Sequence, residues 1–506
     1  MTKNILEMLE NSAERFPNKI AFTDESVSAS YLEFMNNAKK IGTSISKIGK
    51  TKAPIAVFID KSVACLEAMM GVVYSGNFYA VIDTTMPKDR IAVIFNTLSP
   101  AAIITTDENI EKAKELLADG EIISCDKAKS GEIDAEKLAK IRKSAIDTDP
   151  IYALFTSGST GVPKGAVICH RSVIDYAHWV CDTFEITSET VFASQTPFYF
   201  SMSVLDIFST INSGATFHIV PQSLFSFPIN LIKFLNEKKV NTIYWVPSAL
   251  CIIANWKALD EAIPNYLKKV LFAGEVMPTK QLNIWIEKMP SDTLFANLYG
   301  PTEITDICTY YVVDRKIDDN ESLPIGYPCD NCDILILRDD GTIAKKGEEG
   351  ELCVRGSFLA LGYYNNPVKT SESFVQNPLN PYYPELIYKT GDLVKINERG
   401  EIIYVSRKDF QIKHMGYRIE LGEIETAVSA IEGIEASVCV YDGEKDRIVL
   451  IYQSETLTKK DILAGVSNAL PKYMYPNKLI KIDEMPYNRN GKIDRAYLKN
   501  NYNSLK

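Results

Sequence analysis

An apolar run that leads directly into a loop of glycines and hydroxyl residues is the feature that most narrows what this chain can fold into. The run extends from Ile151 to Phe155, and Thr-Ser-Gly-Ser-Thr-Gly-Val-Pro-Lys-Gly follows it. In α/β proteins such a loop directs backbone amides and hydroxyls at an anion, and a lysine adds positive charge. The sequence therefore predicts a phosphate-binding loop formed by Thr156, Ser157, Gly158, Ser159, Thr160, Gly161 and Lys164.

This loop differs from the Walker A loop of nucleotide hydrolases. Counted from Gly158, the Walker pattern requires glycine where Pro163 stands and a hydroxyl residue where Gly165 stands. The chain therefore supplies neither the loop amide nor the magnesium-binding hydroxyl of that motif.

The distribution of apolar residues predicts an α/β fold. Much of the chain alternates β-branched runs with amphipathic stretches, which indicates parallel α/β structure. From about residue 324, short strands separated by Asp-Gly, Glu-Gly and Arg-Gly turns indicate a β-rich subdomain. We expect a large amino-terminal domain of parallel α/β subdomains over 1–406, with the β-rich part at about 324–406, and a small α+β carboxy-terminal domain over 407–506.

Charge and cysteine content exclude several classes of protein. The 506 residues include 55 Lys and Arg against 65 Asp and Glu, a net charge of −10, so we expect neither nucleic acid nor an anionic membrane as partner. Ten cysteines are too dilute for a disulfide framework, and no apolar run approaches the roughly 20 residues that span a bilayer. With no signal peptide at its start, the chain is expected to be cytoplasmic, and Cys329-Asp-Asn-Cys332 to mark a turn and not a zinc site.

Five further motifs follow the loop in a fixed order. They are Asn297-Leu-Tyr-Gly-Pro-Thr-Glu303, Gly350-Glu-Leu-Cys-Val-Arg-Gly356, Tyr388-Lys-Thr-Gly-Asp392, the segment from Ser406 to Glu420, and Asn490-Gly-Lys492. Together with the loop they resemble the signatures of the adenylate-forming ligase superfamily, which comprises acyl-CoA synthetases, luciferases and the adenylation domains of peptide synthetases. The resemblance spans nearly the whole chain.

The resemblance implies that the chain binds ATP and Mg²⁺. Tyr299 offers a ring for adenine to stack on, and Asn297 an amide for the edge of the base. Asp392 would accept the ribose hydroxyls with help from Arg407, and Glu303 would bind Mg²⁺, a cation that prefers oxygen ligands. Gly300 and Thr302 belong to the same motif. Taken singly, Tyr299 could be a core residue, Asp392 a turn acceptor and Glu303 a helix cap.

The resemblance also implies a reaction in two steps. Lys492 would stabilise the charge that develops as the acyl-adenylate forms, with Thr156, Lys164 and Glu303 as further catalytic residues. The small carboxy-terminal domain would then rotate about a hinge at Asp409. After rotation, Gly416 would let a pantetheine arm approach the backbone closely.

Substrate choice depends on a pocket that is matched by motif position. Its residues would be Ser201, Met202, Leu205, Leu271, Ala273, Leu298, Asp306 and Ile307. Amino-acid-activating members have Asp where Ser201 stands, and a buried α-ammonium requires a paired charge, so an ordinary α-amino acid is disfavoured. Asp306 could pair with the amine of a β-amino acid or accept from a hydroxyaryl acid, or it could merely cap a turn.

The acceptor of the acyl group would be the phosphopantetheine thiol of a carrier protein that acts in trans, or coenzyme A. The segment Arg418-Ile-Glu-Leu-Gly-Glu-Ile-Glu425 favours the carrier, and the segments 409–421 and 271–278 together are similar to D-alanine:carrier protein ligases. Other hypotheses are an acid:CoA ligase and a non-catalytic nucleotide-binding regulator. We expect a monomer that acts on a small carboxylic acid.

Lys492→Ala separates the two steps. We expect it to cripple acyl-adenylate formation because the developing charge loses its partner, and to leave transfer from a preformed acyl-adenylate largely intact. Pyrophosphate exchange and single-turnover thioester formation measure the two steps. Equal loss of both would contradict a lysine that serves adenylation alone.

Overall fold

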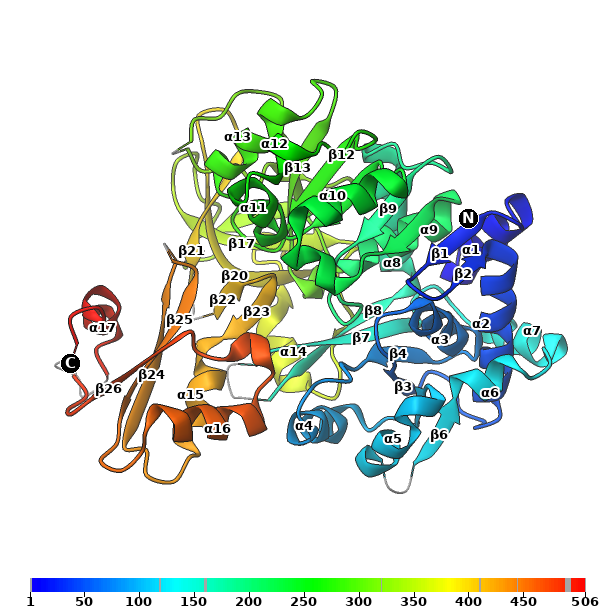
Figure 1. Cartoon of the computed structure of the whole chain (residues 1–506), viewed down its shortest axis with the longest axis horizontal. Coiled ribbons are helices and arrows are strands. Elements are labelled where there is room, and N and C mark those ends of the chain that lie inside the picture. Colours follow the sequence, from blue (N-terminus) through cyan, green and yellow to red (C-terminus); the bar gives the residue numbers. More distant parts are fainter. Residues whose placement is uncertain are drawn as a thin grey trace. The chain divides into compact units, whose positions relative to one another are not determined.

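The computed structural model describes residues 2–117, 120–158, 162–319, 321–408, 411–443, 445–486 and 493–505 (Figure 1). The chain divides into two units. The first contains residues 1–84, 99–154 and 165–408, and the second contains 85–98, 155–164 and 409–506. A functional boundary near Ser406 stays a prediction.

Two largely parallel sheets form the body of the first unit, as the alternating apolar runs predict. The larger sheet has the order β15-β14-β13-β12-β11-β9-β10-β1-β2 and is parallel from β13 to β1. Its strands are β1 (Ile20–Thr23), β2 (Ser28–Ser30), β9 (Val191–Ser194), β10 (Thr216–Ile219), β11 (Thr242–Trp245), β12 (Lys269–Ala273), β13 (Leu294–Tyr299), β14 (Thr309–Val312) and β15 (Tyr327–Pro328).

The second sheet has the order β18-β8-β7-β4-β3-β5-β6. Its strands are β3 (Pro54–Phe58), β4 (Phe78–Val81), β5 (Ala102–Thr105), β6 (Glu121–Ser124), β7 (Pro150–Thr156), β8 (Lys164–Cys169) and β18 (Gly362–Tyr363). The fully buried strands β3, β4 and β5 are continuous apolar runs, as expected for parallel strands that are covered on both faces.

Helices cover these sheets. They are α1 (Ile5–Arg15), α2 (Tyr31–Ser46), α3 (Val63–Tyr74), α5 (Ile110–Leu116), α6 (Cys125–Lys129), α7 (Ala135–Ser144), α8 (His170–Thr183), α9 (Ser203–Ser213), α10 (Pro228–Glu237), α11 (Pro247–Asn255), α12 (Ala258–Glu261), α13 (Thr279–Lys288) and α14 (Pro367–Ser373). Helices α2 and α3 approach closely where Gly71 faces Ile41. A Cβ on Gly71 would lie only 2.4 Å from Cγ2 of Ile41, so a glycine permits this approach. In the described residues no helix is long and apolar enough to cross a bilayer.

The predicted β-rich part is a five-stranded antiparallel sheet with β20 at its centre. The strands are β16 (Cys332–Leu337), β17 (Gly350–Gly356), β19 (Phe374–Gln376), β20 (Leu386–Ile396) and β21 (Ile402–Arg407). The backbone amide of Cys332 donates to the carbonyl of Cys329 across 3.1 Å, which confirms that the two cysteines enclose a turn before a strand.

The second unit combines helices with two small sheets. Strands β22 (Gln411–His414) and β23 (Tyr417–Glu420) form a hairpin, and β24 (Ala436–Asp442), β25 (Arg447–Gln453) and β26 (Lys478–Ile482) form a sheet. Its helices are α4 (Lys88–Leu98), α15 (Leu421–Ser429), α16 (Lys459–Ala469) and α17 (Arg495–Asn501). The predicted α/β fold class is confirmed.

Candidate active site

Strand ends in the first unit bring three of the predicted nucleotide-binding residues together. Tyr299 ends β13, while Asp392 on β20 faces Arg407 on the neighbouring β21. Arg407 Nη1 donates to Asp392 Oδ1 across 2.8 Å, and the Tyr299 hydroxyl donates to Asp392 Oδ2. A carboxylate has about four acceptor positions, so those that remain can accept the two hydroxyls of a ribose.

Burial accounts for the electrostatics of this cluster. Asp392 is only 3% exposed, and Tyr299 is buried as well. Burial raises the pKa of Tyr299 well above its usual value, and the Asp392 carboxylate adds to that shift, so the phenol keeps its proton and remains a donor.

Asn297 lies two residues before Tyr299 on β13. Its Nδ2 donates to the carbonyl of Pro324 across 2.7 Å, which ties the strand to the start of the β-rich part. The amide nitrogen has a second proton and the amide oxygen is an acceptor, so the Asn297 side chain can still form hydrogen bonds with the edge of a base.

Glu303 lies in a short 3₁₀ turn, Thr302–Ile304, directly after the strand that Tyr299 ends. Its side chain is fully buried, and Oε1 accepts a hydrogen bond from the Tyr363 hydroxyl across 2.7 Å. No group of three or more acidic, His or Cys residues that could hold a metal occurs among the described residues. Mg²⁺ is usually bound by one or two carboxylates together with phosphate oxygens and water, and a single Glu303 fits that donor set.

The backbone after Glu303 is strained. Thr305, a β-branched residue, has φ = 72°, a region that such residues rarely occupy. A hydrogen bond of 2.8 Å from its hydroxyl to the carbonyl of Phe358 holds it there. At Gly300 an added Cβ would lie 2.1 Å from the Asp306 carbonyl oxygen, so only glycine permits this close approach.

Asp306 points into a cluster of hydroxyls. Its Oδ2 accepts from Tyr176 on α8 across 2.7 Å and from Tyr244 on β11 across 3.0 Å. Burial raises the pKa of Asp306 to about 8, although the two tyrosine hydroxyls and Ser201 oppose the shift. The carboxyl group is therefore largely protonated at neutral pH and becomes charged as the pH rises through about 8.

The predicted pocket residues lie in the core of the first unit. Tyr244 and Leu271 are paired on β11 and β12, and Ala273 and Leu298 are paired on β12 and β13. Ser201 Oγ lies 3.3 Å from Thr302 Oγ1, which connects the predicted pocket to the Glu303 motif. The apolar members are all buried: Met202, Leu205, Leu271, Ala273, Leu298 and Ile307.

The described part of the predicted phosphate loop belongs to the second unit. Thr156 ends β7 and Lys164, which is buried, begins β8, with a hydrogen bond of 3.5 Å from Thr156 Oγ1 to the Lys164 carbonyl. A Cβ on Gly158 would lie 2.0 Å from the carbonyl oxygen of Val162, so glycine is required. Ser159, Thr160 and Gly161 lie outside the described residues.

Ser157 connects this loop to the hairpin that carries Gly416. Its hydroxyl donates to the carbonyl of Arg418 across 2.7 Å and accepts from the amide of Glu420 across 3.2 Å. Met415 and Gly416 both have positive φ, at 51° and 79°, as a two-residue hairpin turn requires. Asp409 and Lys492 lie outside the described residues, so their roles stay predictions.

Sequence reasoning missed several residues near these groups. The tyrosines Tyr176, Tyr244 and Tyr363 bind the buried carboxylates, yet they lie 60 to 130 positions away from them in the chain. In the second unit, Arg90 and Glu423 form a buried ion pair that no motif indicates. Among these, Tyr244 has a local signal, because it lies in the short apolar strand β11, near the carboxyl end where ligands bind in α/β sheets.

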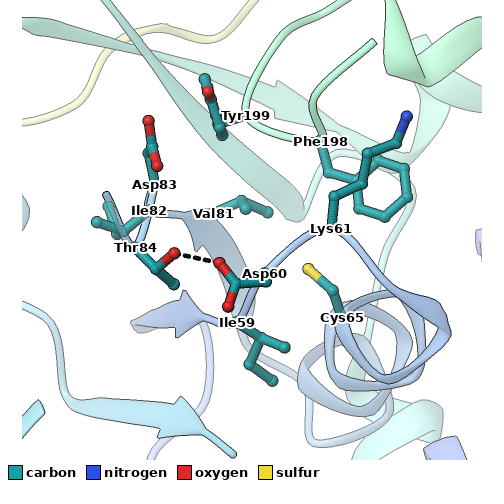
Figure 2. A pocket seen from close by; sticks show the side chains of 10 residues that line it. All are labelled: Ile59, Asp60, Lys61, Cys65, Val81, Ile82, Asp83, Thr84, Phe198 and Tyr199. Carbon is teal, nitrogen blue, oxygen red and sulfur yellow. Dashed lines mark hydrogen bonds between the residues drawn. The ribbon is translucent and has the colours of Figure 1, made fainter. Parts of the chain in front are cut away.

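A small pocket lies at the carboxyl ends of β3 and β4 in the first unit (Figure 2). It is lined by Ile59, Asp60, Lys61, Cys65, Val81, Ile82, Asp83, Thr84, Phe198 and Tyr199. The Thr84 hydroxyl donates to Asp60 on its floor. Sequence reasoning did not predict this pocket.

A tyrosine at the end of β13, a buried carboxylate paired with an arginine on the antiparallel strands β20 and β21, and a second buried carboxylate after β13 are compatible with an α/β protein that binds a nucleotide. The sequence matches the family model described as "AMP-binding enzyme" over residues 9–364. The chain therefore belongs to the AMP-binding enzymes, which are adenylate-forming ligases.

Relatives and solved structures agree with this family. The chain is 30% identical to the D-alanine–D-alanyl carrier protein ligase of Bacillus cereus, over 98% of both chains. It is 31% identical to bacitracin synthase 1 of Bacillus licheniformis over 98% of this chain, but spans only 9% of that relative. The Vibrio cholerae adenylation domain AlmE, solved with glycyl-adenosine-5'-phosphate, shares the fold with a TM-score of 0.85 at 20% identity, over 100% of this chain and 98% of that one.

Asp392→Asn tests the nucleotide cluster. Removal of the charge weakens the hold on Arg407 and on ribose hydroxyls, so we expect the dissociation constant of ATP to rise about tenfold or more. Titration calorimetry with ATP and Mg²⁺ measures it without any acid. Asp339→Asn is a matched control, because that exposed carboxylate pairs only with Lys408 across 2.6 Å among the contacts described. Equal affinities for the two variants would contradict the assignment.

Proposed function

We propose that the chain activates a small carboxylic acid with ATP and passes the acyl group to the phosphopantetheine thiol of a carrier protein that acts in trans. The observation that supports this most strongly is the cluster of Asp392, Arg407 and Tyr299 one short turn from the buried carboxylate of Glu303. The cluster suits the hydroxyls of a ribose, and Glu303 suits a cation that is bound to phosphate.

In the first step a carboxylate oxygen of the acid attacks the α-phosphorus of ATP, and pyrophosphate leaves with the electron pair of the broken P–O bond. Asp392 and Arg407 would orient the nucleotide, while Lys164 and the hydroxyl of Thr156 would face the phosphates. Lys492 would stabilise the negative charge that develops on the transferring oxygens. Mg²⁺ held at Glu303 would neutralise phosphate charge.

In the second step a thiolate attacks the acyl carbon, a thioester forms and AMP leaves. The chain needs no nucleophile of its own for this step. The tight turn at Met415 and Gly416 supports a role for the hairpin in thiol approach, because a glycine there adds no side chain. Rotation of the small carboxy-terminal domain about Asp409 would exchange Lys492 for this hairpin.

Asp306 and Ser201 support an acid other than an ordinary α-amino acid. Ser201 supplies no charge for an α-ammonium, whereas Asp306 is buried and its tyrosine partners add no positive charge that would compete with an ammonium. A β-amino acid would place its ammonium further from the carboxyl group, and a hydroxyaryl acid would place a phenol there. These two classes are the favoured substrates.

Three other functions remain distinct hypotheses. A D-alanine:carrier protein ligase is supported by the relative at 30% identity. An acid:CoA ligase would form its thioester on coenzyme A and not on a holo-carrier. A nucleotide-binding regulator would bind ATP without acid-dependent exchange, and the buried Glu303 and Asp392 argue for catalysis instead.

Pyrophosphate exchange with D-alanine, L-alanine, β-alanine, 3-aminobutyrate, 4-hydroxybenzoate and butyrate tests the proposal. We expect exchange with a β-amino or hydroxyaryl acid, and Ser201→Asp to gain exchange with the alanines, because it supplies the missing countercharge. D-alanine as the best acid of the unchanged chain would favour the carrier ligase. Absence of exchange with every acid would favour the regulator.

Asp306→Asn and pH separate the two favoured classes. If an ammonium pairs with Asp306, kcat/KM should rise between pH 6 and about 8, because the carboxyl group, with its pKa raised to about 8, must lose its proton. Asp306→Asn should remove that rise and lower kcat/KM about tenfold or more. A hydroxyaryl acid should show neither effect, and Tyr244→Phe serves as the control that keeps the charge.

A further inference from the structure

The loop between β9 and α9 carries the first residues of the predicted acyl pocket. It contains residues 195–202, with Ser201 and Met202 at its end, and Leu205 follows on α9. Ser201 also contacts Thr302. The position of this loop therefore fixes where the pocket residues lie relative to the Glu303 motif.

A pocket, and not packed core, lies under part of the loop. Figure 2 shows Phe198 and Tyr199 on one side of it, and Asp60 and Thr84 from the ends of β3 and β4 on the other. Side chains that border a void lack partner atoms there, so packing holds the loop less firmly at this point. Some other interaction has to fix it.

Lys61, three residues after the end of β3, contacts the residue before the loop and the ring of Phe198 within it. Its Nζ donates to the carbonyl of Ser194, the last residue of β9, across 2.9 Å. The same atom lies 5.4 Å from the centre of the Phe198 ring, and Figure 2 shows the two side chains next to each other. Beyond the loop, Lys61 interacts electrostatically with Asp206 on α9.

Asp206 requires such a cation. It is 1% exposed, and its Oδ1 has no hydrogen-bond partner among the described residues. Burial raises the pKa of Asp206 and lowers that of Lys61, and the charge of each opposes the shift of the other. A buried carboxylate without a nearby cation is costly, so the charge of Lys61 also stabilises Asp206 in the first turn of α9.

We propose that Lys61 is a positioning residue that fixes the loop 195–202 through Ser194, Phe198 and Asp206, and thereby sets the affinity of the enzyme for its acid. Lys61 makes no contact with the reacting groups in this account. The proposal rests on the proposed function only where it takes Ser201 and Met202 as pocket residues.

Hydrogen exchange followed by mass spectrometry tests the positioning role without any substrate. In Lys61→Met we expect the amides of residues 195–202 to exchange about tenfold faster, the factor that the loss of one charge-assisted hydrogen bond gives. Lys61→Arg should restore slow exchange, because it keeps the charge and the donor. Unchanged exchange in the loop, or an equal increase throughout the chain, would overturn the proposal.

Two further variants keep this test decisive. Lys61→Met with Asp206→Asn removes both charges, so the loop can be measured even if the single variant leaves Asp206 too costly to fold. Lys112→Met is the matched control, because Lys112 also lies over a ring, that of Phe58 at 5.7 Å, at the same sheet edge. We expect Lys112→Met to leave exchange in 195–202 unchanged. Faster exchange in this control equal to that of Lys61→Met would refute a specific role.

Steady-state kinetics then test whether the position of the loop sets the affinity for the acid. With an acid that the unchanged chain uses, Lys61→Met should raise the KM for the acid about tenfold and leave the KM for ATP unchanged, with rescue by Lys61→Arg. Equal increases in both constants would indicate a merely structural role. If no acid supports exchange, the proposed function fails, while hydrogen exchange still decides the positioning role.

Discussion

Tyrosine hydroxyls that hold buried carboxylates are the interaction on which the first unit's site depends. Tyr299 donates to Asp392, Tyr363 to Glu303, and Tyr176 and Tyr244 to Asp306. A carboxylate buried without hydrogen bonds would cost several kcal/mol or would take up a proton. A phenol satisfies an oxygen and yet adds no positive charge, so the carboxylate can still attract a cation.

Among the contacts described, Asp392 has an arginine partner, and Asp392 is the carboxylate that we propose meets a neutral group. Arg407 balances the charge of Asp392, which suits the hydroxyls of a ribose. Glu303 and Asp306 are held by phenols, which suits Mg²⁺ and an ammonium or phenol of the acid. The raised pKa of Asp306 is the expected consequence of its burial.

The sequence predicted the fold class and the family because motifs lie in continuous segments. Asn297 to Glu303 covers one strand and one turn, so order and spacing can be read along the chain. The partners of the buried carboxylates Asp306 and Glu303 could not be predicted, because Tyr176 and Tyr363 reach them from other elements. Folding brings them close, and sequence spacing holds no record of distances across 60 or more residues.

Transfer of isotope from the acid to AMP tests the central claim, formation of an acyl-adenylate, most directly. The chain is incubated with ATP, Mg²⁺, a thiol acceptor and an acid that carries ¹⁸O in both carboxylate oxygens. The account predicts AMP with one ¹⁸O atom, because the oxygen that attacks the α-phosphorus stays with AMP when the thioester forms. Unlabelled AMP, or ADP and phosphate in its place, would contradict the account.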